Sequence, residues 1–289
     1  MIDVQQVHYG YNHSTVLTNL SLKESEPVIT ALWGRNGAGK TTLMSLLAGH
    51  QRPDRGTIFI KGEEPYNNLH AQNHLCYIQE NHPFSKNWTV RDLLKFGNYF
   101  HQNWNQELAD ELVEVFELPT KKKITKFSKG MKTAAQIILG LASNASVTIL
   151  DEPTNGLDAV KRKHFYDALI TSYENNPRLI LLSTHHIEEI QPICESLIVI
   201  HDGKVRIHQT MEEVRERGIL LTGSTEGIQS ATENVNIIES SKIGSISKVM
   251  VDEKHSKEWK DIASAHQLSI ENASLQDYLI NITNKKEVE

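Results

Sequence analysis

A glycine-rich segment after an apolar run places the strongest constraint on the fold of this 289-residue chain. The apolar run at residues 28–33 stops at Gly34, and residues 41–49 have a helical pattern. Between them, Gly34-Arg-Asn-Gly-Ala-Gly-Lys-Thr41 fits the pattern G-x-x-x-x-G-K-[ST]. A buried strand, a tight loop and a helix in this order predict the first unit of a parallel α/β sheet.

The same segment has the chemistry of a phosphate-binding loop. Glycines let successive backbone N–H groups point toward one anion, and the helix adds the positive end of its dipole. Lys40 can reach the β and γ phosphates of a nucleotide, and the Thr41 hydroxyl suits Mg²⁺. The alternative is a glycine-rich helix cap that binds nothing, but the flanking strand and helix favour the phosphate site. The residues predicted to bind ATP here are Gly34, Arg35, Asn36, Gly37, Ala38, Gly39, Lys40, Thr41 and Thr42.

Two acids end a second apolar run, Val147-Thr-Ile-Leu-Asp-Glu152. Ligands of open α/β sheets bind at the carboxyl ends of strands, so both carboxylates are expected beside the phosphate-binding loop. Asp151 would help to hold Mg²⁺ through water, and Glu152 would polarise or deprotonate the water that attacks the γ-phosphate. Either acid alone could be a solvated residue or a helix cap. Further strands are predicted at residues 179–182 and 197–200, with a helix at 159–173.

The order of motifs along residues 1 to about 208 resembles that of the ATP-binding subunits of ABC transporters. The motifs that carry the resemblance, besides the loop and the acid pair, are Tyr77-Ile-Gln-Glu80, Phe127-Ser-Lys-Gly-Met131, Asn155-Gly-Leu-Asp158 and Leu182-Ser-Thr-His185. The resemblance implies a P-loop NTPase fold of the α/β class, with an antiparallel β subdomain and a helical subdomain at about residues 85–145. It also implies ATP and Mg²⁺ as cofactors, and ATP hydrolysis coupled to transmembrane transport.

The resemblance assigns roles in the nucleotide site to Gln79, His185 and Tyr11. Gln79 would contact Mg²⁺ or the attacking water, and His185 would contact the γ-phosphate and hold Glu152 in line with the water. A turn glutamine and a structural histidine are the alternatives. Tyr11 would stack on adenine, with Tyr9 as the competitor and a simple strand aromatic as the third interpretation.

The signature departs from the family's usual Leu-Ser-Gly-Gly-Gln. Ser128 and Gly130 would still donate a hydroxyl and a backbone N–H to the γ-phosphate bound by a second subunit. Lys129 lies in a lysine-rich segment that can be a solvated face, and it would add positive charge near the partner's nucleotide. Asp158 would organise the contact between two nucleotide-binding domains, although an acid before a helix is commonly a cap.

The resemblance implies two partners. One is a second nucleotide-binding subunit, identical or different, because each ATP lies between the loop of one chain and the signature of the other. The second is a separate transmembrane permease, whose cytoplasmic helices would be gripped by the aromatic-rich residues 84–104; core packing is the other interpretation of that stretch. The longest apolar runs fall short of the ~20 residues of a membrane span, and no signal peptide pattern is found, so the expected location is cytoplasmic, peripheral on the inner face of the membrane.

Charge composition narrows the functions further. Lys and Arg total 30 against 36 Asp and Glu, and the net charge of -6 gives no overall cationic field for a nucleic-acid partner. Signatures of the Ser-Lys-Gly-Met type resemble those of small bacterial exporter subunits. The implied cargo is therefore peptides, antimicrobials or amphipathic toxins of the phenol-soluble-modulin kind. The alternative is a soluble ABC-type ATPase that acts on ribosomes or DNA, which typically has two nucleotide domains or a long coiled-coil insertion.

The sequence pattern changes at about residue 209. Short apolar runs at 218–221, 235–238 and 246–251 alternate with polar helical stretches, and residues 285–289 form a charged end. A small α/β domain is therefore predicted at residues 209–289, after an ATP-binding domain at residues 1–208. Residues 269–283 resemble the last helix of small ABC exporters, which implies an accessory domain for dimer contact. A purely structural role is the alternative.

Overall fold

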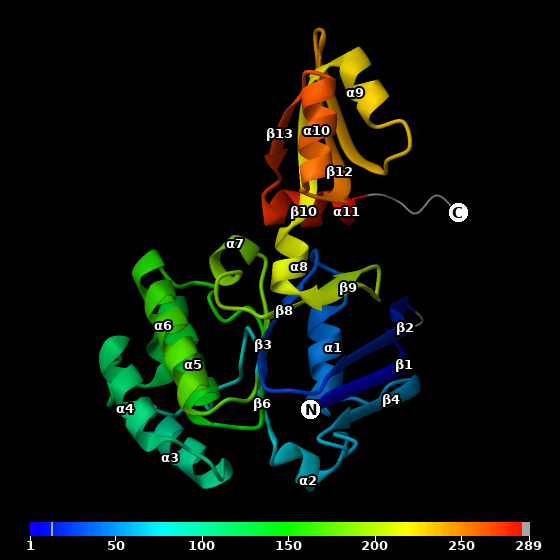
Figure 1. The fold of residues 1–289 in the computed structure, drawn as a ribbon. Coiled ribbons are helices and arrows are strands. Elements are labelled where there is room, and N and C mark those ends of the chain that lie inside the picture. The colour runs from blue at the N-terminus through cyan, green and yellow to red at the C-terminus, as the bar shows by residue number, and fades with distance from the viewer. Residues whose placement is uncertain (13, 285–289) are drawn as a thin grey trace. The chain divides into compact units, whose positions relative to one another are not determined.

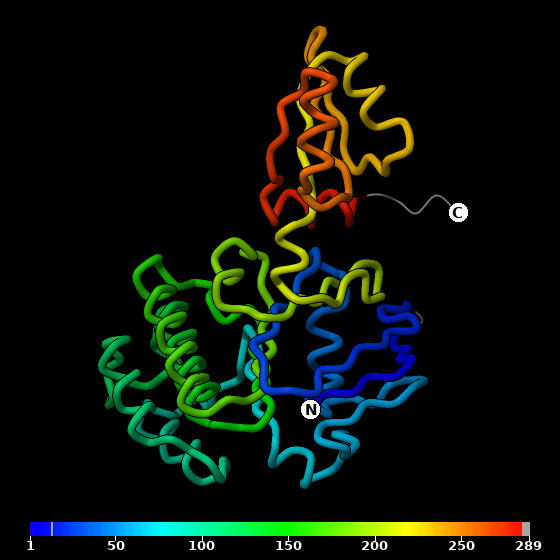
Figure 2. The backbone as a smooth tube through the Cα atoms, in the orientation of Figure 1, coloured from blue at the N-terminus to red at the C-terminus, as the bar shows by residue number. Residues whose placement is uncertain are grey.

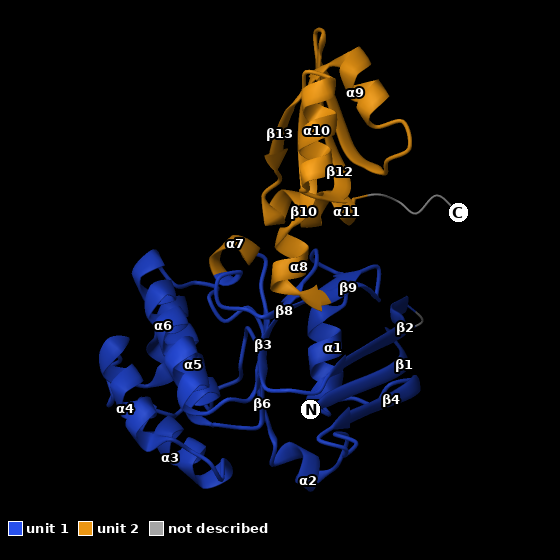
Figure 3. Cartoon of the chain, in the orientation of Figure 1, with its two compact units in different colours: residues 1–185, 190–208 blue, residues 186–189, 209–289 orange. Residues whose placement is uncertain are grey.

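The chain forms two compact units in the computed structural model, which describes residues 1–12 and 14–284 (Figures 1 and 3). The first unit comprises residues 1–185 and 190–208, and the second comprises residues 186–189 and 209–289. The charged end predicted at residues 285–289 lies outside the described residues. Within the described ranges, every helix is too short or too polar to span a bilayer.

A six-stranded sheet forms the centre of the first unit. Its order is β5-β6-β7-β3-β8-β9, and the first five of these strands pair in parallel. All residues of β6 and β7 are buried, which explains why these strands appear in the sequence as unbroken apolar runs. The strands are β3 (Val28–Trp33), β5 (Leu75–Ile78), β6 (Val147–Leu150), β7 (Leu179–Ser183), β8 (Ser196–His201) and β9 (Lys204–Thr210). The predicted strands at 147–150, 179–182 and 197–200 are confirmed.

An antiparallel three-stranded sheet completes the core of this unit. Its order is β2-β1-β4, with β1 (Ile2–Tyr11), β2 (Ser14–Glu24) and β4 (Arg55–Ile60). Helix α1 (Lys40–Leu47) begins at the loop after β3, and the buried side chains of Leu43, Leu46 and Leu47 belong to one apolar cluster with residues of both sheets. Because α1 shares its core with both sheets, packing holds the start of this helix firmly in place.

Helices fill most of the interval between β5 and β6, where the resemblance implies a helical subdomain at about residues 85–145. They are α3 (Val90–Phe100), α4 (Gln106–Val115), the short 3₁₀ helix η1 (Ile124–Lys126) and α5 (Lys129–Ala142), while α2 (Leu69–Gln72) precedes β5. Helix α5 buries ten consecutive residues from Thr133 to Ala142, so its first turn is placed by a well-packed remainder. Helix α6 (Ala159–Asn175) connects β6 to β7, and α7 (Ile187–Ile190) follows β7.

The second unit has a β-α-β-β-α-β order and its own apolar core. Figure 2 traces the path of its backbone. Its sheet order is β11-β12-β10-β13, with antiparallel pairs throughout. After α8 (Met211–Arg215), the elements are β10 (Arg217–Ser224), α9 (Thr225–Ala231), β11 (Ile237–Ile243), β12 (Ile246–Lys254), α10 (Lys257–Ala265), β13 (Ser269–Asn272) and α11 (Leu275–Ile282).

The expected last helix at residues 269–283 is only partly right. Residues 269–272 pair with β10 as the strand β13, and the helix begins after Ser274, whose hydroxyl accepts the backbone N–H of Asp277. These residues form a strand because they pair with the edge of β10, and the local sequence does not show that this edge is available. Pairing with β10 therefore overrides the expected helix at residues 269–272.

Candidate nucleotide site

The loop between β3 and α1 requires glycine for two separate physical reasons. Gly37 and Gly39 have φ angles of 84° and 106°, in the region that residues with a side chain rarely adopt. Space is the second reason, because a Cβ at Gly34 would lie 2.5 Å from the Ile200 carbonyl oxygen and one at Gly39 would lie 2.6 Å from a methyl carbon of Leu17. The glycines are therefore fixed by backbone shape and by packing, and the loop is preorganised as an anion cradle.

Lys40 lies at the base of this cradle and is only 8% exposed. Its Nζ donates to the carbonyl oxygens of Gly34, at 2.6 Å, and Arg35, at 3.4 Å. Burial lowers the pKa of the ammonium, while the nearby carboxylates of Glu152 and Asp151 act in the opposite direction. A phosphate group would give this buried cation the anionic partner that two neutral carbonyl groups do not supply.

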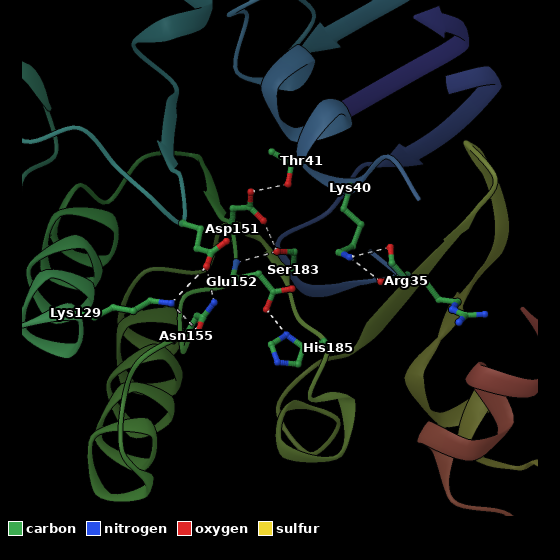
Figure 4. A network of polar contacts seen from close by, with 11 residues as sticks. Arg35, Lys40, Thr41, Lys129, Asp151, Glu152, Asn155, Ser183 and His185 are labelled. Atoms are coloured by element: carbon green, nitrogen blue, oxygen red, sulfur yellow. Dashed lines mark hydrogen bonds and ion pairs between the residues drawn. The ribbon is translucent and has the colours of Figure 1, made fainter. Parts of the chain in front are cut away.

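Asp151 joins the cradle to the end of β6. Its Oδ2 accepts the Thr41 hydroxyl at 2.9 Å, and its Oδ1 accepts the Ser183 hydroxyl at 2.7 Å (Figure 4). Burial raises the pKa of this carboxyl, opposed by the hydrogen bonds from Ser183 and Thr41 and by the charge of Lys40. Ser183, which ends the apolar run of β7, is not among the residues predicted from the sequence; a polar residue at the carboxyl end of a buried strand was the available signal.

Thr41 and Asp151 fit a magnesium ion. Both provide hard oxygen atoms, and Mg²⁺ is usually held by one or two protein groups together with water and substrate phosphates. Within the part of the chain that the structure describes, no group of three or more His, Cys, Asp or Glu side chains could hold a metal by itself.

Glu152, the second residue of the acid pair, contacts His185. Glu152 has a φ of 49°, an uncommon conformation for a non-glycine residue, and its N–H donates to the Ser183 hydroxyl at 2.8 Å. Its Oε2 lies 2.8 Å from Nδ1 of His185, and the carboxylate side chain is only 13% exposed (Figure 4). The strained backbone and both hydrogen bonds fix the direction of a carboxylate that the sequence predicts to be catalytic.

The phosphate-binding loop and the acid pair line a cavity of about 370 Å³, and His185 reaches this site through its contact with Glu152. Besides predicted residues of the loop and the acid pair, its walls include Val16 and Glu80, which were not predicted from the sequence. Gln79 precedes Glu80, and its Nε2 lies 3.3 Å from His50 Nδ1. The loop and the acid pair therefore line one cavity. Glu80 lies in the wall of this cavity, whereas the predicted residue Gln79 does not.

The two tyrosines at the end of β1 have different surroundings. Tyr9 donates its hydroxyl to Gln51, whereas the ring of Tyr11 is 42% exposed and meets the Tyr9 ring edge-on, with 5.0 Å between centroids. Tyr11 thus offers the freer ring face of the two, which favours it over Tyr9 as the residue that stacks on a base.

The signature residues and Asp158 lie at helix starts. The Ser128 hydroxyl accepts the N–H of Met131 at 3.3 Å as the N-cap of α5, and Asp158 accepts the N–H of Lys161 at 2.9 Å as the N-cap of α6. That backbone hydrogen bond is the main cause of a lowered Asp158 pKa. Among the described residues that line the cavity, Ser128, Gly130 and Asp158 do not occur. The chain therefore presents them elsewhere on its surface.

The sequence comparisons agree with this geometry. The family profile described as ABC transporter matches residues 17–155. The chain is 35% identical over 209 residues to Nod factor export ATP-binding protein I of Burkholderia thailandensis, covering 70% of this chain and 68% of that protein. It is 28% identical over 219 residues to the ABC transporter ATP-binding protein YtrB of Bacillus subtilis, covering 76% of this chain and 75% of that protein.

Solved structures show the same fold. An ATP-binding subunit of an ABC transporter superposes with a TM-score of 0.68 at 25% identity, over 74% of this chain and 92% of that one. A dimeric bacterial ABC transporter cassette superposes with a TM-score of 0.64 at 19% identity, over 73% of this chain and 99% of that one.

Proposed function

The chain belongs to the ABC transporter ATPase family, and we propose that it binds ATP and Mg²⁺ in the cavity between the loop and the acid pair and powers a separate membrane permease. The observation that carries this proposal is the convergence of Lys40, Thr41, Asp151 and Glu152 around one cavity, with His185 in contact with Glu152. These residues come from three separate parts of the sequence, and each provides a different part of phosphoryl-transfer chemistry.

Different residues of the chain bind the phosphates, hold Mg²⁺ and activate the attacking water. Backbone N–H groups of the loop and the Lys40 ammonium bind the phosphates, while Thr41 and Asp151 would hold Mg²⁺. The ion, when bound, neutralises charge on the phosphate oxygens. Glu152 accepts the proton of the attacking water, and His185 keeps that carboxylate aligned through its Nδ1 contact.

A second nucleotide-binding subunit completes the site in this proposal. Ser128 and Gly130 lie at the start of α5, where a hydroxyl and a backbone N–H can bind a phosphate, yet they do not line the cavity of their own chain. The bacterial cassette that shares this fold is itself a dimer, which supports a second subunit here. Asp158, at the start of α6, would contact the other subunit.

An aromatic surface on the helical part of the first unit supports a protein partner. Trp88 packs on Phe96, with 4.7 Å between ring centroids, and Phe96 packs on Phe100 at 4.3 Å. Tyr99 and Phe100 are 82% and 57% exposed. Large exposed rings in one cluster are typical of interaction sites, so this surface would grip the permease and hold the chain on the inner face of the membrane.

Export is the direction that the relatives favour. Several are named Nod factor export proteins, which supports an exporter, and we retain peptides, antimicrobials or amphipathic toxins as its cargo from the signature. We assign residues 1–208 as the ATP-binding domain and residues 209–289 as an accessory domain for dimer contact. The separate sheet and apolar core of the second unit support this division.

The test uses Glu152→Gln in the full-length protein. This variant should bind ATP, lose turnover by about 10²-fold to 10⁴-fold, and elute as a dimer with ATP and Mg²⁺ but as a monomer without them. Glu114→Gln, at an exposed site on α4, is the matched control and should behave as wild type. Unchanged hydrolysis in Glu152→Gln would remove the catalytic role. Purification with ribosomes instead of a membrane protein would favour the soluble alternative.

A further inference from the structure

The first turn of α5 packs closely against the loop that follows Glu152. A Cβ at Gly130 would lie 2.7 Å from the Gly156 carbonyl oxygen, and one at Gly156 would lie 2.8 Å from Cγ of Lys129. The Thr133 hydroxyl donates to the Asn155 carbonyl oxygen at 2.9 Å. Two backbones and the aliphatic part of Lys129 therefore fit against each other with no room for another side chain at either glycine.

The ammonium group of Lys129 contacts two polar side chains of its own chain. Its Nζ donates to Asn155 Oδ1 at 3.0 Å (Figure 4). The same Nζ lies 3.7 Å from Glu80 Oε1. Asn155 Nδ2 in turn donates to Glu80 Oε1, which closes a triangle of contacts. Gln136, two turns further along α5, donates to the Glu80 carbonyl oxygen at 3.3 Å. The start of α5 is thus connected to both segments.

The three corners of this triangle belong to three different motifs. Glu80 follows Gln79 and lines the nucleotide cavity, and Asn155 lies between Glu152 and Asp158. Lys129 lies between Ser128 and Gly130, which in the proposed function serve the ATP of the other subunit. The triangle therefore links residues beside the ATP site of one chain to residues that act on the ATP site of its partner.

We propose that Lys129 is a positioning residue that couples the two ATP sites by connecting the signature to Glu80 and Asn155 within its own chain. This inference rests on the proposed function, since it requires the signature to act on a second subunit. It replaces the expectation that Lys129 adds charge beside the partner's nucleotide, because its ammonium already has two partners in its own chain.

The exposure of these groups sets the size of the effect. The side chains of Lys129 and Glu80 are 57% and 36% exposed, and ion pairs at such positions contribute little and are screened by salt. We therefore expect changes of about threefold to fivefold at low ionic strength, with a much smaller difference in about 1 M salt. A contribution from packing alone would not depend on salt.

The first experiment measures backbone hydrogen exchange in the nucleotide-free, full-length protein. Lys129→Met keeps an aliphatic stem against Gly156 but removes the ammonium, so the amides of residues 154–158 should exchange about threefold to fivefold faster. Lys129→Arg should restore the wild-type rate, and Lys126→Met, at an exposed lysine on η1, is the control. Equal exchange in wild type and Lys129→Met overturns the inference without involving ATPase activity.

The second experiment is a double-mutant cycle in steady-state ATPase activity. Lys129→Met and Glu80→Gln should each lower kcat by about threefold, and the double variant should lose no more than the larger single effect. Multiplied losses, or a Lys129→Met effect that persists unchanged in high salt, overturn the inference. A wild-type protein that hydrolyses ATP only as a monomer contradicts the proposed function instead, while the exchange result still decides whether the connection exists.

Discussion

The phosphate-binding loop and the signature segment both lie at the start of a helix, but their surroundings differ. Lys40 is 8% exposed and lies in a cavity formed by its own chain, near the carboxylates of Asp151 and Glu152, which follow β6. The Lys129 side chain is 57% exposed, and no residue of the signature lines that cavity, among the residues described. The loop lines a cavity formed by its own chain, whereas the signature residues that we propose as phosphate donors do not.

The largest expected difference between the two regions concerns Lys40. Lys40→Ala removes a charged hydrogen-bond donor to phosphate, so a titration with a fluorescent ATP analogue should show affinity reduced by about tenfold to a hundredfold, even in the monomer. Lys121→Ala, at an exposed position, serves as the control. Wild-type affinity in the Lys40 variant would contradict the assignment of the loop.

Gly130→Ala should change the signature segment and leave the phosphate-binding loop unaffected. The added Cβ would meet the Gly156 carbonyl oxygen at 2.7 Å and force α5 to shift, so we expect about tenfold lower ATPase activity. The nucleotide affinity of the monomer should stay at the wild-type value, because Gly130 does not line the cavity. If monomer affinity falls together with turnover, the two regions are not separable.

Tyr11→Ala tests the proposed stacking of Tyr11 on adenine. Loss of one stacked ring corresponds to about 1–3 kcal/mol, so ATP binding to the monomer should weaken by about tenfold, with equal effects for GTP. Tyr9→Phe removes only the hydroxyl that donates to Gln51 and should leave affinity unchanged. A greater loss in Tyr9→Phe than in Tyr11→Ala would reverse the choice between the two tyrosines.

Ser128→Ala should give the smallest effect. The variant loses one neutral hydrogen bond to phosphate, so ATPase activity should fall by about fivefold while monomer affinity is retained. Ser128 also caps α5, so melting temperature must be measured alongside activity. Ser128→Asp keeps a helix cap but places a carboxylate, which repels phosphate, at this position. If Ser128→Asp has wild-type activity and helix stability, Ser128 acts only as the cap of α5.

Much of the site could be predicted because its residues lie at recognisable places in the sequence. A glycine pattern after an apolar run locates Lys40 and Thr41, and acids after a second run locate Asp151 and Glu152. Ser183 and Glu80 were missed for different reasons. The polar end of β7 was a signal for Ser183, but its partners Asp151 and Glu152 lie in another part of the sequence, and Glu80 follows the more conspicuous Gln79.

The sequence by itself determined the parallel sheet, the phosphate-binding loop and the acids at the strand end, because local pattern and backbone chemistry specify these features. Tertiary structure decided what each side chain contacts. The Lys129 ammonium lies beside Glu80 and Asn155 only because α5 packs against the loop around Gly156, and Ser269–Asn272 became a strand only because β10 offered a free edge. Such contacts depend on segments far apart in the chain, which no local pattern specifies.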